Sequence, residues 1–138
     1  MNQTQGQVEA AITKAIVKFE GEFMGRGPTG CRTYLVENLV VVHLTGTMTK
    51  GEYQLAKNAT PTIVNGFREN ANRELIKSMR RELLERGRPL LEKAVNGLTG
   101  RRVVSVHTDM STVNGDRVIV FLMDDVPEVV DKDNIHRP

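Results

Sequence analysis

The feature that most constrains the fold is the short segment 39–44, Leu-Val-Val-Val-His-Leu. Its β-branched residues favour an extended backbone, in which successive side chains point to opposite faces of a sheet. Because apolar residues then occupy both faces, this strand should lie inside a sheet or be covered twice. The longest purely apolar run, residues 39–42, is far shorter than the roughly 20 residues that a membrane-spanning helix needs. The segment predicts a protein built around a sheet, with no membrane span.

Two strand pairs are predicted, one before and one after the middle of the chain. Residues 31–46 alternate in polarity and are interrupted by Glu37-Asn38, which suits a tight turn because Asn tolerates a positive φ. Residues 101–110 and 117–123 form the second pair, with the turn signal Asn114-Gly115 between them. The pattern therefore predicts two hairpins.

Helical periodicity precedes and separates these hairpins. Residues 5–24 carry apolar side chains every three or four positions and end at Gly25, the usual place for a left-handed cap. The pair Thr49 and Glu52 forms a capping box that predicts a short helix to about residue 57. A long helix is expected over residues 60–100, with a kink or break at residues 86–89, where Gly and Pro interrupt the pattern.

The order helix, hairpin, long helix, hairpin predicts an α+β fold. We expect four mostly antiparallel strands with the helices packed on one face. The length of 138 residues suits one domain, and 39% hydrophobic with 26% charged residues excludes a disordered, fibrous or membrane-spanning class. We assign residues 1–123 to this domain and residues 124–138, which are rich in acid, to a flexible tail.

The N-terminus and the cysteine count indicate a compartment. The first residues have neither the basic nor the apolar region of a signal peptide. The one cysteine, Cys31, cannot form an internal disulfide, which favours a reducing environment. We expect a cytoplasmic protein that is at most peripheral to the inner membrane.

The charge of the chain is small overall but unevenly distributed. The formal net charge is +2, which does not point to nucleic acid as a partner. Residues 60–102 hold ten basic and five acidic side chains, whereas residues 124–138 hold two basic and five acidic ones. Helical spacing between opposite charges predicts that much of the basic face pairs with itself. The candidate residues for a partner surface are Arg80, Arg81, Arg101 and Arg102.

The most unusual local string is Gly-Arg-Gly-Pro at residues 25–28. Glycines let backbone amides approach an anion and an arginine adds a charged fork, so Arg26, Gly27 and Arg32 are candidate anion ligands. The string follows a helix C-terminus, however, which is the wrong pole of the helix dipole for an anion. A helix cap followed by a turn is the alternative interpretation.

No residue pattern predicts catalysis, a cofactor or a metal. Cys31 has no nucleophile signature around it, and no Gly-x-Ser-x-Gly motif occurs. The histidines at positions 43 and 107, with Asp109, lack the spacing of a metal site. We expect a protein that is not an enzyme.

The chain resembles the MpsC-like family of small bacterial proteins over about residues 6–123. Gly-Arg-Gly-Pro after a helix is the most specific shared feature. The other features, in order, are Arg32, Val40-Val41-Val42 with Gly46, Thr49 with Glu52, Arg68, Leu98-Thr99-Gly100, the segment 103–109, and Val120-Phe121. Two departures are Met48, where a Leu-Thr pair is usual, and Gly87-x-Pro89, which interrupts an expected continuous helix.

The family's name implies a sodium-linked system that generates membrane potential, with membrane components that resemble inorganic-carbon transporters. The family has no agreed catalytic residues. We therefore expect a non-enzymatic accessory or regulatory protein that binds a membrane transporter subunit. The long helix and an exposed strand edge favour a homodimer. Two alternatives are a sensor of a small anion, bicarbonate or a nucleotide, at Arg26 and Arg32, and a nucleic-acid-binding protein that uses the basic helix.

Overall fold

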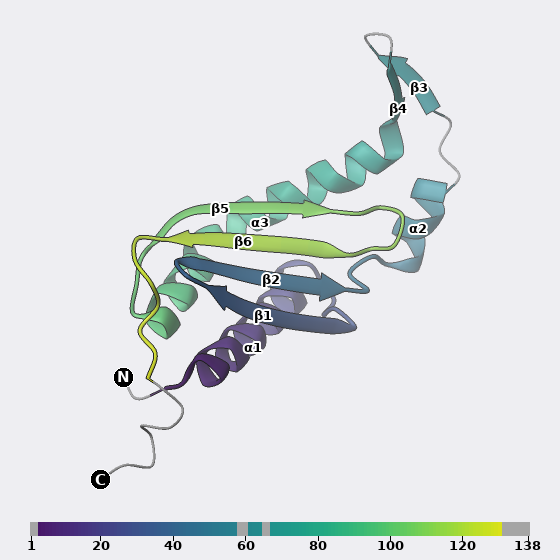
Figure 1. The fold of residues 1–138 in the computed structure, drawn as a ribbon. Helices are drawn as coiled ribbons and strands as arrows, with labels where there is room; N and C mark the ends of the chain where they lie inside the picture. The colour runs from purple at the N-terminus through teal and green to yellow at the C-terminus, as the bar shows by residue number, and fades with distance from the viewer. Residues whose placement is uncertain (1–2, 58–60, 65–66, 131–138) are drawn as a thin grey trace.

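The computed structural model describes residues 3–57, 61–64 and 67–130, and the side chains of all of these except 61–64 and 67–70. Figure 1 shows the path of the chain. The elements are α1 (Gln5–Phe23), β1 (Gly30–Val36), β2 (Leu39–Thr45), α2 (Lys50–Lys57), β3 (Pro61–Val64), β4 (Phe67–Asn70), α3 (Ala71–Thr99), β5 (Val103–Met110) and β6 (Arg117–Met123).

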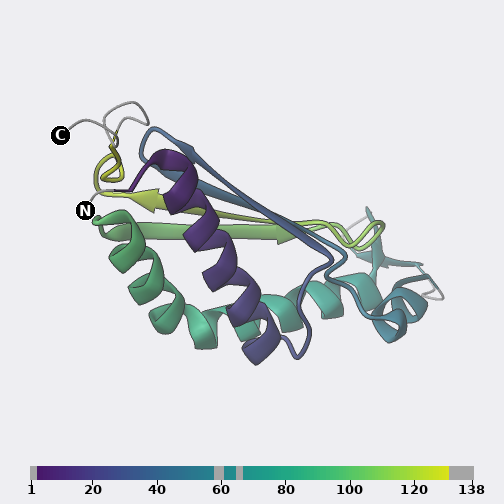
Figure 2. The same cartoon turned by 90° about the horizontal axis from the view of Figure 1, so that it is seen from below.

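The sheet has the order β1-β2-β6-β5, and every neighbouring pair is antiparallel. The two predicted hairpins are thus joined through β2 and β6, which are the interior strands. Helices α1 and α3 lie side by side across one face of this sheet, whereas the other face has no helix over it (Figure 2). The predicted α+β class, with antiparallel hairpins, is confirmed.

The core lies between the two helices and the sheet. It is aliphatic apart from two phenylalanines, in line with the scarcity of aromatic residues in the chain. Its buried members are Val8, Ile12, Ile16, Phe19, Val40, Val42, Leu44, Leu84, Leu91, Val95, Ile119, Phe121 and Met123. The apolar stripe of α1 and every second residue of β2 and β6 supply most of it, so the periodicities of the sequence do identify the buried positions.

The ends of the short elements follow their local sequences. Gly25 has a φ of +77° directly after α1, which confirms the left-handed conformation expected there. Thr49 and Glu52 exchange hydrogen bonds of 2.9 and 3.1 Å between side chains and backbone amides, so the predicted capping box at α2 is confirmed. In the β1–β2 turn the positive φ, +55°, belongs to Glu37 and not to its neighbour Asn38, which the sequence analysis had favoured.

The predicted start of the long helix at residue 60 is wrong. The chain first forms the antiparallel pair β3–β4, and α3 begins only at Ala71. The physical reason is local: Thr-Ile-Val at residues 62–64 is β-branched and stiff, which favours a strand over a helix. Asn65-Gly66, a strong hairpin signal, separates the two strands in the sequence, although these two residues lie outside the described ranges.

Helix α3 is continuous through Gly87 and Pro89, so the predicted interruption is not a break. Figure 2 shows its axis changing direction along its length, as expected where a proline removes one backbone hydrogen bond. Gly87 lies against α1: a Cβ placed on it would come within 2.4 Å of the ring of Phe19. The glycine therefore lets the two helices approach closely.

Residues 124–130, the first part of the segment predicted as a tail, run back along the end of the sheet. The amide of Glu128 donates to the carbonyl of Thr99, and the amide of Val130 donates to that of Gln3. Residues 131–138 lie outside the described ranges. The flexibility of the tail remains a prediction.

Candidate functional site

The residues predicted to hold an anion have different surroundings. The Nη1 of Arg26 donates to the carbonyl oxygen of Met48 at 3.0 Å, which ties the α1–β1 connection to the segment after β2. Gly27 lies in the same connection, near Val17. Arg32 is exposed on β1, opposite His43 of β2, on the face of the sheet away from the helices. The structure thus gives Arg26 a bracing hydrogen bond and places Arg32 on an open surface.

The four arginines of the predicted partner surface do not form one patch. Arg80 is only 5% exposed, so it contributes no surface, contrary to expectation. Arg81 is exposed beside it. Arg101 and Arg102 follow the far end of α3, roughly 30 Å away at 1.5 Å of rise per residue. There Arg101 donates to the carbonyl of Val126, whereas the backbone of Arg102 is bonded to Asp124.

Two ion pairs that no sequence pattern predicted lie on the side of the sheet that the helices cover. Arg117 of β6 donates from Nη1 to Oε1 of Glu20 on α1 at 2.9 Å, and both side chains are only 2% exposed. Burial raises the pKa of Glu20, although the charges of Arg117 and Arg80 act in the opposite direction. Burial likewise lowers the pKa of Arg117. This pair is therefore surrounded by an apolar core that disfavours its charges.

The second pair joins α3 to α2. Arg80 donates from Nη2 and Nε to the two carboxylate oxygens of Glu52, at 2.6 and 3.1 Å, and also donates to the carbonyl of Thr47. Burial alone would raise the pKa of Glu52, but the hydrogen bonds from Arg80 and Thr49 bring it below its usual value of 4.5. The two pairs are electrostatically linked, because Arg80 also acts on Glu20 and Arg117.

The sequence does carry a signal for the two buried arginines, because each occupies a position that the repeat of its strand or helix assigns to the core. Arg117 precedes Ile119 and Phe121 on the buried side of β6, and Arg80 follows Ile76 and precedes Leu84 on α3. Charged side chains are almost never fully buried unless they are paired. An ionic residue on an apolar stripe therefore predicts a buried partner, even though the partner itself cannot be named from spacing.

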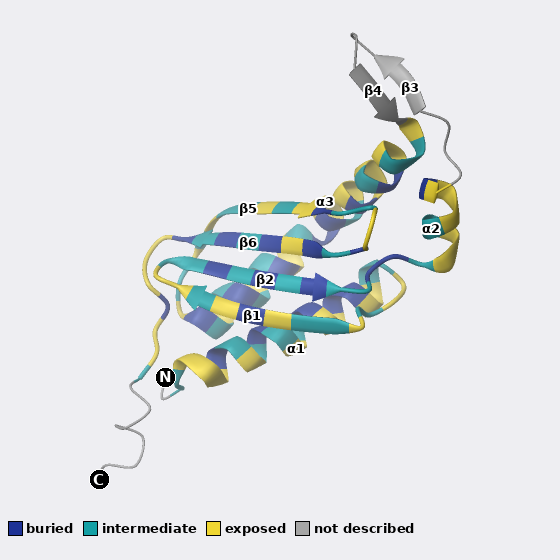
Figure 3. Ribbon diagram, turned by 45° about the vertical axis from the view of Figure 1, so that its right-hand side comes forward, coloured by how far each residue is buried: buried dark blue, intermediate teal, exposed yellow. Residues whose placement is uncertain are grey.

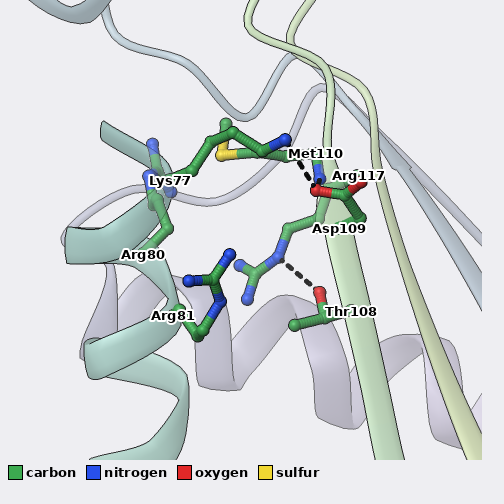
Figure 4. A pocket seen from close by; sticks show the side chains of 7 residues that line it. All are labelled: Lys77, Arg80, Arg81, Thr108, Asp109, Met110 and Arg117. Carbon is green, nitrogen blue, oxygen red and sulfur yellow. Dashed lines mark hydrogen bonds and ion pairs between the residues drawn. The ribbon is translucent and has the colours of Figure 1, made fainter. Parts of the chain in front are cut away.

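A small pocket of about 10 Å³ opens between α3 and the β5–β6 hairpin, next to both ion pairs. Figure 4 shows the side chains that line it: Lys77, Arg80, Arg81, Thr108, Asp109, Met110 and Arg117. Lys77 pairs with Asp109 at 3.1 Å, and Nε of Arg117 donates to the hydroxyl of Thr108 at 3.3 Å. The hydrogen bonds from Lys77 and from the amide of Met110 lower the pKa of Asp109. The pocket wall is thus mainly cationic.

No helix of the described chain covers the sheet face away from α1 and α3, as the view of β1, β2 and β6 in Figure 3 shows, and the interior strands present mainly apolar side chains on it. Register places its side chains in rows that cross the four strands. One row is Arg32, His43, Val118 and Asp109, the next is Tyr34, Val41, Val120 and His107, and the third is Val36, Leu39, Leu122 and Ser105. Val118, on the interior strand β6 in the first of these rows, is 38% exposed. The apolar second face of β2 thus has no cover from the described part of the chain.

Each edge of the sheet carries a feature that hinders pairing with a further strand. At β1 the amide of Leu35 donates to Glu9 at 2.8 Å, and its carbonyl accepts from Gln5 at 3.2 Å. These two groups would otherwise offer hydrogen bonds to another strand. At β5 the register shifts between Val103 and Ser105, a bulge that leaves Val104 exposed. Side-chain caps and bulges are the usual protection of a sheet edge.

The described residues contain no group of three His, Cys, Asp or Glu side chains placed to hold a metal ion. Burial, with a smaller contribution from the charge of Glu20, raises the pKa of Cys31 to about 11. Its thiol is therefore a poor nucleophile at neutral pH. None of the helices in the described ranges combines the length and apolar character that crossing a bilayer requires.

Comparison with known proteins gives a consistent result. The chain is similar to the uncharacterized protein YbcI of Bacillus subtilis (strain 168), with 33% identity over 133 residues, 96% of this chain and 98% of the relative. No solved structure matches it. The family model described as "Na+-translocating membrane potential-generating system (MpsC)" matches residues 4–125. Since that match spans nearly the whole chain, the protein belongs to the MpsC family.

Proposed function

We propose that this protein is a non-enzymatic accessory protein that acts through protein–protein contacts, as a homodimer, in a membrane-associated ion-translocating system. The observation that carries the proposal is the open sheet face. Isolated exposed valines are common, but a contiguous apolar face with protected edges favours a face that another protein covers. The family's name supplies the kind of system, since it refers to Na⁺ translocation and membrane potential.

A second copy of the chain is the occupant that the rows of the open sheet face favour. Two sheets that pack face to face keep their strands nearly aligned. A two-fold axis parallel to the strands, between β2 and β6, would place β1 over the partner's β5. It would also keep each row over itself, as a symmetric dimer requires. Arg32 would then lie opposite the partner's Asp109, and Val41 opposite the partner's Val120. At the edges of the first row charge meets opposite charge, and at the centre of the other two rows apolar meets apolar.

Light scattering on the purified protein tests the dimer. We expect a dimer at micromolar concentration for the natural chain and a monomer for Val120→Asp, which puts a charge in the middle row of the open sheet face. The matched control is Val113→Asp, because Val113 is 74% exposed in the β5–β6 connection and should not affect association. A natural chain that stays monomeric across this range would remove the homodimer from the proposal.

A separate experiment tests the membrane-associated role. The tagged protein is recovered from gently solubilised membranes of its host after mild cross-linking, and co-purifying proteins are identified by mass spectrometry. The proposal predicts a membrane transporter subunit with the natural chain and with Val113→Asp. Recovery of the chain alone under cross-linking would contradict the accessory role and leave only self-association. We also propose a cytoplasmic location, peripheral to the inner membrane, which cell fractionation checks.

The other two functions drawn from the sequence have less support. Nucleic-acid binding through the basic helix lacks a continuous basic surface, since Arg80 is buried and Arg101 binds the chain after β6. An anion site at the Gly-Arg-Gly-Pro string has less support, because Nη1 of Arg26 is engaged by Met48 and Arg32 lies exposed on β1. Four basic side chains gather instead around the pocket between α3 and the β5–β6 hairpin.

A further inference from the structure

We propose that the pocket between α3 and the β5–β6 hairpin is a binding site for a small monovalent inorganic anion of about the size of chloride. The ligands are the guanidinium groups of Arg117 and Arg81 and the ammonium group of Lys77. The three ligands take no part in the dimer proposed above. The two proposals meet at Asp109, whose place in the register is on the open sheet face but whose carboxylate pairs with Lys77 of α3 at the sheet edge.

The central observation concerns Arg117. Its side chain is only 2% exposed, and its Nε and Nη1 are bonded to Thr108 and Glu20. Its Nη2 is buried and has no hydrogen-bond partner among the described residues. A buried donor left unpaired costs about 1–3 kcal/mol, and more when the group is charged. The guanidinium lines the pocket, so a pocket-bound acceptor could satisfy it.

The surrounding charges favour an anion as that acceptor. Figure 4 shows the guanidinium groups of Arg81 and Arg117 next to one another, whereas Lys77 reaches across the pocket to Asp109. Asp109 is the one carboxylate in the lining, and Lys77 neutralises it at 3.1 Å. Glu52 is engaged by Arg80 from the other side. Arg117 is likewise paired with Glu20, so Arg81 is the lining cation without an ion pair among the described residues, and its excess positive charge favours an anion.

The other lining groups suit such an ion. The hydroxyl of Thr108 accepts from Nε of Arg117, so its own proton remains to be donated. Met110 supplies an apolar and polarisable wall. Strongly hydrated ions would lose more hydration free energy on entering this site than weakly hydrated ones. Guanidinium groups are themselves weakly hydrated, so they match a weakly hydrated anion better.

The size of the pocket limits the ligand. A volume of about 10 Å³ is close to the minimum that one water molecule needs. A chloride ion is larger than a water molecule, so it fits only when Arg81, which is exposed and long, moves outward. A nucleotide is far too large to be enclosed. The site therefore differs in ligand as well as in position from the one predicted at Arg26 and Arg32.

The test uses chloride as the probe. Gluconate replaces it in the control, at the same ionic strength. We expect the broadening of the ³⁵Cl NMR line by the protein, and the rise of its melting temperature, to saturate with chloride. Gluconate, which is too large for the pocket, should give no such rise. Arg81→Gln should weaken the chloride response at least about tenfold, as expected for the loss of a charge-assisted hydrogen bond.

The matched control is Arg86→Gln, which removes the same charge from an exposed position on α3 that pairs only with Glu82 at the surface among the described residues. Its chloride response should equal that of the natural chain. Equal responses of the two variants would show general screening by salt and overturn the site, as would the absence of a saturable response. Val120→Asp, whose cross-strand partner is His107 and not a pocket residue, should keep the response, so that failure of the dimer and failure of the anion site are told apart.

Discussion

The two faces of the sheet carry similar residues but have different surroundings. On β2, Val40, Val42 and Leu44 are fully buried under α1 and α3, whereas Leu39 and Val41 point to the side without helices. In the sequence of β2, the side chains that point to either face are mainly apolar. What separates the faces is the presence of helices that are themselves amphipathic and connected closely enough to cover one side. An apolar pattern on both faces therefore predicts two covers, of which the described chain supplies one.

The faces also differ in how they hold charge. On the covered side, Arg117 and Glu20 form a pair that is sealed in the core, at 2% exposure. On the open side, His43 and Asp116 approach to 3.2 Å but remain about two-fifths exposed. Buried charges need a partner to be tolerated at all, whereas exposed pairs contribute little. The covered side is thus where substitutions should have large effects, and the open side where they should be small in the monomer.

The largest effect should come from two neighbours on β6 that point to opposite faces. Ile119→Ala, on the covered face, should lower the free energy of unfolding by about 2–5 kcal/mol, because it leaves a cavity in the core. Val118→Ala, on the open face, should change it by less than about 0.5 kcal/mol. Urea denaturation of the dilute monomer measures both. Equal losses would mean that the open face is already covered within the monomer.

A smaller loss should follow from Glu52→Gln, which removes the charge-assisted bonds to Arg80. We expect about 1.5–3 kcal/mol at pH 7. Since the pKa of Glu52 is lowered by folding, its contribution is present above its usual value of 4.5 and is lost as the pH falls through the folded value. The difference in stability between the natural chain and the variant should therefore shrink below about pH 4.5. A difference that is constant from pH 7 to pH 3 would contradict this account.

Gly87→Ala tests the close approach of α3 to α1 that positions the covered side. Overpacking against the ring of Phe19 should cost about 1–3 kcal/mol, partly offset by the better helix propensity of Ala, worth up to about 1 kcal/mol. Gly97→Ala on the same helix is the control, since a Cβ there meets nothing within 4 Å. It should raise the melting temperature. If both variants raise it, the helices are not in tight contact at residue 87.

Much of this fold was predictable from local sequence. The hairpins around Asn38 and Asn114 and the helix before Gly25 follow from alternation, period and turn chemistry, which are all properties of neighbouring residues. The pair β3–β4 was missed because Ile63 and Phe67 also fit a helical period. The competing signal, three β-branched residues followed by Asn-Gly, was the stronger one. Periodicity alone therefore assigned a strand pair to a helix.

The candidate pocket was less predictable, because its members come from separate parts of the chain. Arg80 and Arg81 were singled out as a surface, but adjacent positions on a helix point about 100° apart. One of them is buried against Glu52 while the other faces solvent. Arg117 carried no motif and was not selected. Its position in phase with Ile119 shows that it is buried, but only the packing of α1 on the sheet brings it to Glu20, 97 positions away in the sequence.

The smallest effect is expected for His43→Gln on the open sheet face. In the monomer, the loss of a pair with Asp116 that is about two-fifths exposed should change the free energy of unfolding by less than about 0.5 kcal/mol. In the proposed dimer the same pair would be covered by the row that contains the partner's Val118, and its loss would weaken association. The comparison is therefore made at two protein concentrations, below and above the dissociation constant of the dimer. Suppose that light scattering shows a dimer but the change in unfolding free energy is equally small at both concentrations. The dimer contact would then lie away from this row. A change that grows with concentration would locate it there, because only association can turn an exposed pair on this face into a buried one.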